Sequence, residues 1–156
     1  MRAKFFLISL ISLISFSTAY TQDATVTDDE LTRYATAMDS INEMSANVMI
    51  LITDMVNGNE TVNAARYNEL SKIIGDETRL NEAKATAEEI AFIKEVAAKK
   101  AEETAKINKA FQSLAKEYVG AATYNKVKKA LAADAALKGK YDALMAELAK
   151  DNPGAD

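Results

Sequence analysis

The chain is 156 residues long, carries 19 basic and 23 acidic residues, and contains neither histidine nor cysteine. Without those two residue types it can form no disulfide bond, no Ser–His or Cys–His catalytic pair and none of the usual zinc sites. The net negative charge argues against nucleic-acid binding, because phosphate contacts need a basic surface. Proline occurs once and no alternating strand pattern is present, so the composition predicts an all-helical protein.

The N-terminus is typical of a secretory signal peptide. Arg2 and Lys4 precede an apolar segment, residues 5–16, and small residues up to Ala19 suit cleavage after that position. The apolar segment is shorter than the roughly 20 residues that a membrane-spanning helix needs. We therefore expect residues 1–19 to be removed, leaving a periplasmic or extracellular protein that has no transmembrane anchor.

The first predicted helix begins after Thr27, which forms a capping box with Glu30. Apolar residues then recur at spacings of three and four, which predicts one long helix with a coiled-coil-like seam. The seam runs through Leu31, Tyr34, Met38, Ile41, Val48, Ile52 and Met55 and is interrupted at Ser45. Gly58 predicts the end of this helix.

One segment of this helix is apolar on every side; it comprises Val48, Met49, Ile50, Leu51 and Ile52. A helix of that kind is normally buried on several sides, so we interpret the segment as the centre of a helical bundle. The alternative is a contact surface for a partner or a second copy, to which the nearby methionines would supply adaptable contacts.

A shorter helix follows, with Tyr67, Leu70 and Ile74 on one face, and Gly75-Asp76 breaks it before a continuation that carries Leu80. The same order of capping box, long apolar seam and short helix then repeats. Thr86 and Glu89 form a second capping box, 59 positions after the first. The second seam runs through Ile90, Ile93, Ala97, Ile107, Phe111, Leu114 and Tyr118, and it is interrupted at Lys100 and Thr104.

Beyond the second long helix the offset becomes 57, so Tyr67-Asn68 aligns with Tyr124-Asn125. A longer final helix carries Leu137, Tyr141, Leu144 and Leu148 on one stripe. We interpret the pattern as a tandem duplication, with repeat 1 at about 27–84 and repeat 2 at about 86–150. Two helical hairpins in the order long, short, long, short predict a four-helix bundle with pseudo-two-fold symmetry. The domain would span 20–150, followed by a disordered tail, 151–156; the alternative is an open arrangement closed by dimerisation.

Two stretches carry a resemblance to a known family. They are Val26-Thr27-Asp28-Asp29-Glu30-Leu31-Thr32-Arg33-Tyr34-Ala35, near the start of the first long helix, and Tyr124-Asn125-Lys126-Val127, followed by Leu131, Asp134, Leu137 and Tyr141. They resemble the opening and closing segments of the bacterial family called domain of unknown function 4168. The resemblance covers most of the predicted mature chain. It implies an exported, mostly helical bacterial protein with no established activity, and it supplies no catalytic residues.

No residue is assigned as catalytic, cofactor-binding or metal-binding. The carboxylates of Asp28, Asp29, Glu30, Glu88 and Glu89 stand in first helical turns, where capping and the helix dipole account for them. Tyr67-Asn68 and Tyr124-Asn125 are candidates either for the flanks of a ligand pocket or, as we favour, for structural packing.

These observations predict a non-enzymatic exported protein that acts through protein–protein contacts, either with an unknown partner or with itself. One alternative is a small-ligand carrier whose pocket is lined by Tyr34, Tyr67, Tyr118, Tyr124 and Tyr141. Another is a periplasmic chaperone-like protein, since small helical stress chaperones have a related helix-opening pattern. A hydrolase that uses only carboxylates, lysine and tyrosine is the least favoured class.

Overall fold

The computed structural model describes residues 25–152, which contain helices and no strand. The predicted all-α class is therefore confirmed for this part of the chain. The predicted signal peptide, 1–19, and the first residues of the expected mature chain lie outside the described residues. No helix within 25–152 has both the length and the apolar character needed to cross a membrane.

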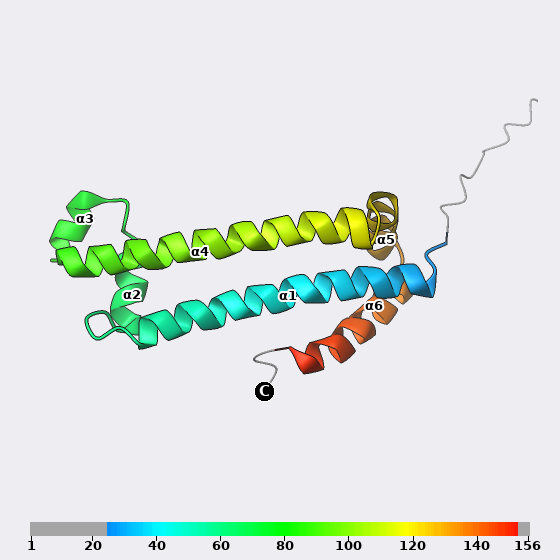
Figure 1. Ribbon diagram of the computed structural model, residues 1–156, viewed down its shortest axis with the longest axis horizontal. Helices are drawn as coiled ribbons and strands as arrows, with labels where there is room; N and C mark the ends of the chain where they lie inside the picture. The colour runs from blue at the N-terminus through cyan, green and yellow to red at the C-terminus, as the bar shows by residue number, and fades with distance from the viewer. Residues whose placement is uncertain (1–24, 153–156) are drawn as a thin grey trace, which may run out of the picture.

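Two long helices form the body of the molecule (Figure 1). Helix α1 (Asp28–Asn57) and helix α4 (Ala87–Ser113) run antiparallel and side by side, spanning about 45 and about 40 Å at 1.5 Å per residue. Both begin with the predicted capping box: Thr27 Oγ1 accepts from the Glu30 amide, and Thr86 Oγ1 accepts from the Glu89 amide. The sequence therefore places both helix starts correctly.

Short helices pack against one end of this pair. A π-helical segment, η1 (Leu114–Tyr118), and Gly120, with a φ of +89°, lead from α4 into α5 (Ala121–Ala133). Helix α6 (Ala135–Leu148) then runs along the N-terminal half of α1, and a 3-10 turn, η2 (Ala149–Asp151), follows. The first hydrophobic cluster lies here and buries Leu31, Tyr34, Ala37, Val119 and Val127.

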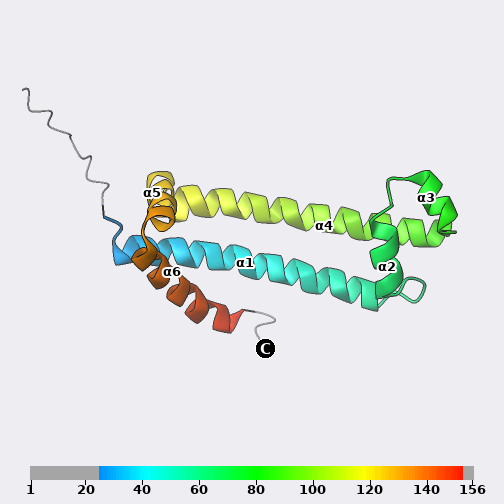
Figure 2. The ribbon, with the colours of Figure 1, turned by 180° about the vertical axis from the view of Figure 1, so that it is seen from behind.

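The opposite end has a smaller pair of helices, α2 (Ala64–Ser71) and α3 (Glu77–Glu82). They lie against the N-terminal part of α4, as the view from behind also shows (Figure 2). The second hydrophobic cluster buries Val62, Leu70, Ile73, Leu80 and Ile93. Each long helix thus begins inside one of the two clusters and ends near the other.

The middle of the molecule contains no comparable core. In the described chain, no residue of α1 between Ala37 and Val56 is buried, and none of α4 after Val96 is buried. The four-helix bundle with pseudo-two-fold symmetry that the sequence predicts is not confirmed. The structure has six α-helices within 25–152, and the shorter ones cover the ends of the long pair and leave its centre as a two-helix span.

The predicted seam of the second long helix is displaced by one residue at its centre. Ala97, Lys100 and Thr104 are exposed, whereas Val96 is buried and Glu103 is half-buried. Val96 removes more apolar surface from water than alanine does, and nearby lysines offset the cost of partly burying Glu103. The predicted final helix that carries Leu137, Tyr141, Leu144 and Leu148 is α6, and Asp134 separates it from α5.

Only two residues of the predicted disordered tail, 151–156, are described. Asp151 closes the 3-10 turn, and the Asn152 amide nitrogen donates to Asp39 Oδ1 of α1 at 2.7 Å. This hydrogen bond places the end of the described chain beside the N-terminal half of α1.

Candidate interaction surface

The apolar segment 48–52 of α1, which we call the central patch, lies on the surface. Met49 is 73% exposed and Ile50 41% exposed, while Val48, Leu51 and Ile52 are half-buried. The interpretation of this segment as the bundle centre is therefore wrong for Met49 and Ile50. With Tyr118, these two side chains are the large hydrophobic residues that stay exposed within the described part of the chain.

Met49 and Ile50 are exposed because α6 stops before the patch and α2 reaches only its last residue, Ile52. The chain that follows α6 meets α1 at Asp39, and Ile50 lies 11 residues further on, about 16 Å along the helix axis. From the other end, α2 reaches only the last turns of α1, where Tyr67 and Asn68 share a shallow groove with Ile52 and Val56. A stretch of roughly three turns between these supports has only α4 beside it.

The two helices carry opposite charge over this central stretch. Between Ala37 and Val56, α1 contains Asp39, Glu43 and Asp54 and no basic residue. The facing part of α4 carries four lysines and two glutamates: Lys99, Lys100, Lys106, Lys109, Glu102 and Glu103. An acidic, apolar helix therefore lies beside a basic, alanine-rich one, so a partner would meet two chemically different strips.

Four of the charges on α4 form one network. The Lys99 ammonium lies 3.2 Å from Glu102 and 2.9 Å from Glu103, and the Lys106 ammonium lies 2.7 and 2.8 Å from the same carboxylates. These hydrogen bonds raise the pKa of both lysines and lower the pKa of both glutamates. All four groups stay ionised at neutral pH, which makes this face of α4 a polar boundary next to the central patch.

The carboxylates of the two capping boxes also tie helices together. Glu30 accepts two hydrogen bonds from the Lys126 ammonium of α5, at 2.7 and 2.9 Å. Glu89 binds the Arg66 guanidinium of α2 through both carboxylate oxygens, at 2.7 and 3.0 Å. The capping interpretation of these two acids is thus confirmed, and each also forms a bridge to a short helix.

Both bridges favour the ionised carboxylates. The hydrogen bonds from Arg66 lower the pKa of Glu89 to about 2, and those from Lys126 lower the pKa of Glu30. The Arg66 guanidinium is held further by Glu69 at 2.9 Å and by the Ala83 carbonyl at 3.1 Å. Among the described residues, no group of three or more potential ligand side chains is placed to hold a metal ion.

The five tyrosines proposed to line one pocket do not meet. Tyr34, Tyr124 and Tyr141 form one cluster, with ring centroids 5.2 and 5.8 Å from that of Tyr34. Tyr67 lies at the other end of the molecule, and Tyr118 is 46% exposed. Burial raises the pKa of Tyr34 to about 12, as expected for a packed core phenol. The structural interpretation of Tyr124 therefore fits its position, and a carrier pocket lined by all five rings is excluded.

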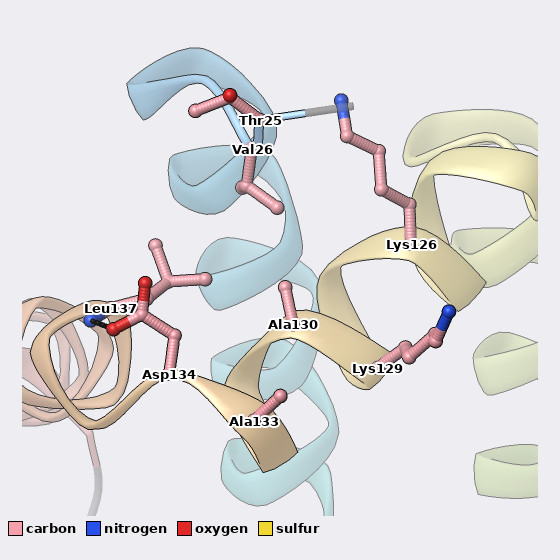
Figure 3. Close-up of a pocket in the computed structure, with 8 residues that line it drawn as sticks. All are labelled: Thr25, Val26, Lys126, Lys129, Ala130, Ala133, Asp134 and Leu137. Atoms are coloured by element: carbon pink, nitrogen blue, oxygen red, sulfur yellow. Dashed lines mark hydrogen bonds between the residues drawn. The ribbon is translucent and has the colours of Figure 1, made fainter. Parts of the chain in front are cut away.

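A groove of about 390 Å³ lies between the residues before α1, helix α5 and the start of α6 (Figure 3). Its apolar wall contains Val26 and Leu137, and its polar atoms include Lys126 and Asp134. The Lys126 ammonium is already bound to Glu30, and Asp134 Oδ1 accepts from the first amides of α6. We therefore interpret this groove as part of the helix junction and not as a ligand site.

Comparison with known proteins identifies no relative: no family model, no curated protein and no solved structure matches the chain. Membership of the family called domain of unknown function 4168 accordingly stays a prediction.

The sequence singled out the central patch as a segment, but the ion pairs described above were not predicted from it. The lysine–glutamate network on α4 has the i,i+3 and i,i+4 spacing that marks helix-surface ion pairs, so its signal was present. Arg66 and Glu89 are 23 residues apart, and Glu30 and Lys126 are 96 apart. No local pattern links such pairs, because they meet only once the helices have packed.

Proposed function

We propose that the chain is a non-enzymatic, exported helical protein that binds another protein through the central patch of α1. The observation that carries this proposal is the exposure of Met49 and Ile50 on a segment flanked by two well-packed ends. Both side chains stand on a helix that is already formed, so binding would not have to pay the entropic cost of ordering this backbone. The acidic character of the same stretch of α1 would favour a partner with basic residues around an apolar strip.

Export is supported by the signal-like residues 1–19. The lack of cysteine leaves the fold independent of redox conditions and is compatible with export. Cleavage after Ala19 would leave a mature chain of 17 basic and 23 acidic residues. Mass spectrometry of the intact protein recovered from outside the cytoplasmic membrane tests this directly. A mass that includes residues 1–19 would contradict cleavage.

We also propose that the chain arose by duplication of one helical hairpin. Residues related by the predicted offset of 59 occupy matching places: Ala37 and Val96 are fully buried near the starts of α1 and α4. At the offset of 57, Leu70 and Val127 are fully buried in the two clusters. Glu30 and Glu89, related by the offset of 59, each bind a cation of a short helix, although Arg66 and Lys126 are not at aligned positions. The matching burial and the matching role of the two glutamates support a pseudo-two-fold relation.

A non-enzymatic role is supported by the residue types and by the state of the carboxylates. The chain has no histidine or cysteine, and its two capping carboxylates, the buried Glu89 and the half-buried Glu30, are committed to ion pairs. A carboxylate whose pKa is lowered is a poor proton donor at neutral pH, and a nearby cation weakens it as a base. These groups are better suited to fixing helix positions than to acid–base chemistry.

Site-specific crosslinking in the cell tests the role of the central patch. A photoreactive amino acid placed at position 50 of the full chain should give adducts of defined mass, whereas the same group at Glu88 should not. Met49→Glu should abolish the adducts by placing a charge in the contact. The matched control, Asn47→Glu, adds the same charge at an exposed position two residues away and should reduce them much less.

The contrary result is equally clear. If position 50 gives no adduct while circular dichroism shows a folded chain, the central patch does not bind a protein. If Met49→Glu and Asn47→Glu reduce crosslinking equally, the effect comes from charge and the proposed apolar contact is wrong.

A further inference from the structure

A single residue separates α5 from α6. Asp134 has an extended backbone, with φ −120° and ψ 106°, while Ala133 ends one helix and Ala135 begins the next. Its carboxylate accepts hydrogen bonds from the amides of Ala136 and Leu137, at 2.8 and 3.1 Å (Figure 3). The break between the two helices therefore depends on the capping preference of one aspartate.

The residues on both sides of this break favour a continuous helix. They read Leu131-Ala132-Ala133 before Asp134 and Ala135-Ala136-Leu137 after it. Alanine and leucine have the highest helix propensities, and no glycine or proline lies among them. The corresponding break at the other end is different: residues 72–76 separate α2 from α3 and include Gly75. Local preference at the α5–α6 junction therefore opposes the observed turn.

Helix α6 contacts α1 through side chains that are only half-buried. No residue of α6 is buried, and its apolar contribution to the first cluster comes from Leu137, Tyr141 and Leu144, all half-buried. Two polar contacts add to it: the exposed pair Lys140–Asp28 at 3.2 Å and the hydrogen bond from Asn152 to Asp39. Departure of α6 would expose Leu31 and Tyr34, the part of that cluster which it covers, until an equivalent helix took its place.

We propose that two copies of this chain exchange α6, each supplying it to α1 of the other. When Asp134 becomes helical, α5 and α6 merge into one helix over residues 121–148, about 42 Å long. The straightened helix carries α6 away from its own α1, and the freed surface around Leu31, Tyr34 and Met38 accepts α6 of the second copy. The occupant is fixed by the structure itself, because that surface already fits α6 in the closed chain.

The closed monomer and the exchanged dimer contain the same contacts between α6 and α1. The balance between monomer and dimer therefore depends on the conformation at Asp134 and on the protein concentration. The closed form keeps the Asp134 cap and gives up helix continuity. The exchanged form gains continuity at two junctions and loses two caps. Exchange of α6 uses the N-terminal half of α1 and not the central patch, so tests of the exchange and of the proposed function are independent.

The test compares substitutions at the junction by light scattering at matched concentrations. Asp134→Ala removes the cap and adds helix propensity, and it should raise the dimer association constant about a hundredfold, because each of the two junctions contributes about tenfold. Asp134→Asn keeps a capping side chain and should behave like the original chain. Ala133→Gly places a glycine before the cap, as Gly75 stands before Asp76, and should lower dimer formation.

A disulfide reports which chain holds α6. The side chains of Asp39 and Asn152 are in contact, and the chain has no cysteine of its own, so Asp39→Cys with Asn152→Cys introduces the only possible crosslink. In a closed monomer the disulfide forms within one chain. In the exchanged dimer of the Asp134→Ala chain it should join two chains, giving a band of doubled mass on a non-reducing denaturing gel.

Three results would overturn the proposal. The Asp134→Ala chain could stay monomeric with its helix content unchanged. It could dimerise while the disulfide still forms within each chain, which would indicate a surface contact without exchange. If Asp134→Ala fails to fold, the comparison of Ala133→Gly with the original chain at high concentration decides: equal interchain disulfide yields would contradict the exchange.

Discussion

The two ends of the molecule each place two short helices at the start of a long helix, but the ion pairs that hold these helices differ in strength. At one end α2 and α3 cover the start of α4, and at the other α5 and α6 cover the start of α1. Each end buries a hydrophobic cluster and ties a capping-box glutamate to a cation from a short helix. The comparison shows which features the fold requires at a helix start and which features vary between the ends.

The cations differ in kind. Arg66 presents a planar guanidinium that engages both oxygens of Glu89 and still reaches Glu69 and a carbonyl group. Lys126 offers a single ammonium to Glu30. A bidentate arginine pair is both stronger and more directional than a lysine pair. The α2–α3 end therefore has the stronger ion pair, although its helices are shorter than α5 and α6.

The first prediction separates the packed ends from the open centre. Leu70 is fully buried, so Leu70→Ala should lower the free energy of unfolding by about 2–5 kcal/mol. Leu51→Ala removes the same atoms from the half-buried centre of α1 and should cost less than half as much, because water already reaches that site. Urea unfolding of the two variants measures both values. Equal losses would mean that the centre is as tightly packed as the ends.

The second prediction compares the two charge bridges. Arg66→Met removes the cation that faces the nearly buried Glu89, whereas Lys126→Met does the same to the more accessible Glu30. The fall in melting temperature should be roughly twice as large for Arg66→Met, since it breaks the bidentate bridge. Arg66→Lys keeps the positive charge but loses the two-pronged guanidinium, so its melting temperature should lie between those of the original chain and Arg66→Met. A larger fall for Lys126→Met would reverse the ranking of the two ends.

Sequence patterns predicted those parts of the fold that depend on neighbouring residues. The capping boxes at Thr27 and Thr86 were correct because a helix start needs only a hydroxyl and a glutamate three residues later. The end of α1 at Asn57 and the break before α3 followed from Gly58 and Gly75-Asp76. The exposed patch of the candidate site was located as a segment, but its exposure depends on where α6 and α2 stop.

The features that were not predicted either leave no pattern in neighbouring residues or lie in residues whose pattern favours a different structure. Asp134 lies in an alanine-rich stretch whose propensity favours helix, so the break between α5 and α6 was not predicted. The centre of α4 was placed one residue out of register because Val96 and Ala97 both fit an apolar seam, and only packing selects the larger side chain. The bundle itself was inferred from two apolar hairpins, and the sequence could not show that each short helix would cover an end.

The third prediction concerns acid. The pKa of Glu89 is lowered from 4.5 to about 2, so its bridge to Arg66 contributes its full stability above pH 4.5 and loses it as the pH falls towards 2. Glu89→Gln should remove this dependence, and the stability difference between variant and original chain should shrink steadily across that range. Hydrogen exchange at the α2–α3 end, measured from pH 5 to pH 2.5, follows the loss locally. A constant difference across the range would show that the Glu89 bridge is not what titrates.

The smallest expected effect lies at the centre, and it sharpens the contrast with the ends. Ile50 is 41% exposed and its flank of α1 faces away from both clusters, so Ile50→Glu should change the free energy of unfolding by no more than about 0.5 kcal/mol. Ile93→Glu, in the second cluster, would place an unpaired charge at a site only 1% exposed and should prevent stable folding. Urea unfolding distinguishes the two outcomes. A severe loss with Ile50→Glu would mean that something covers the central patch in solution, and repeating the measurement across a range of protein concentrations would then identify a second copy as the cover.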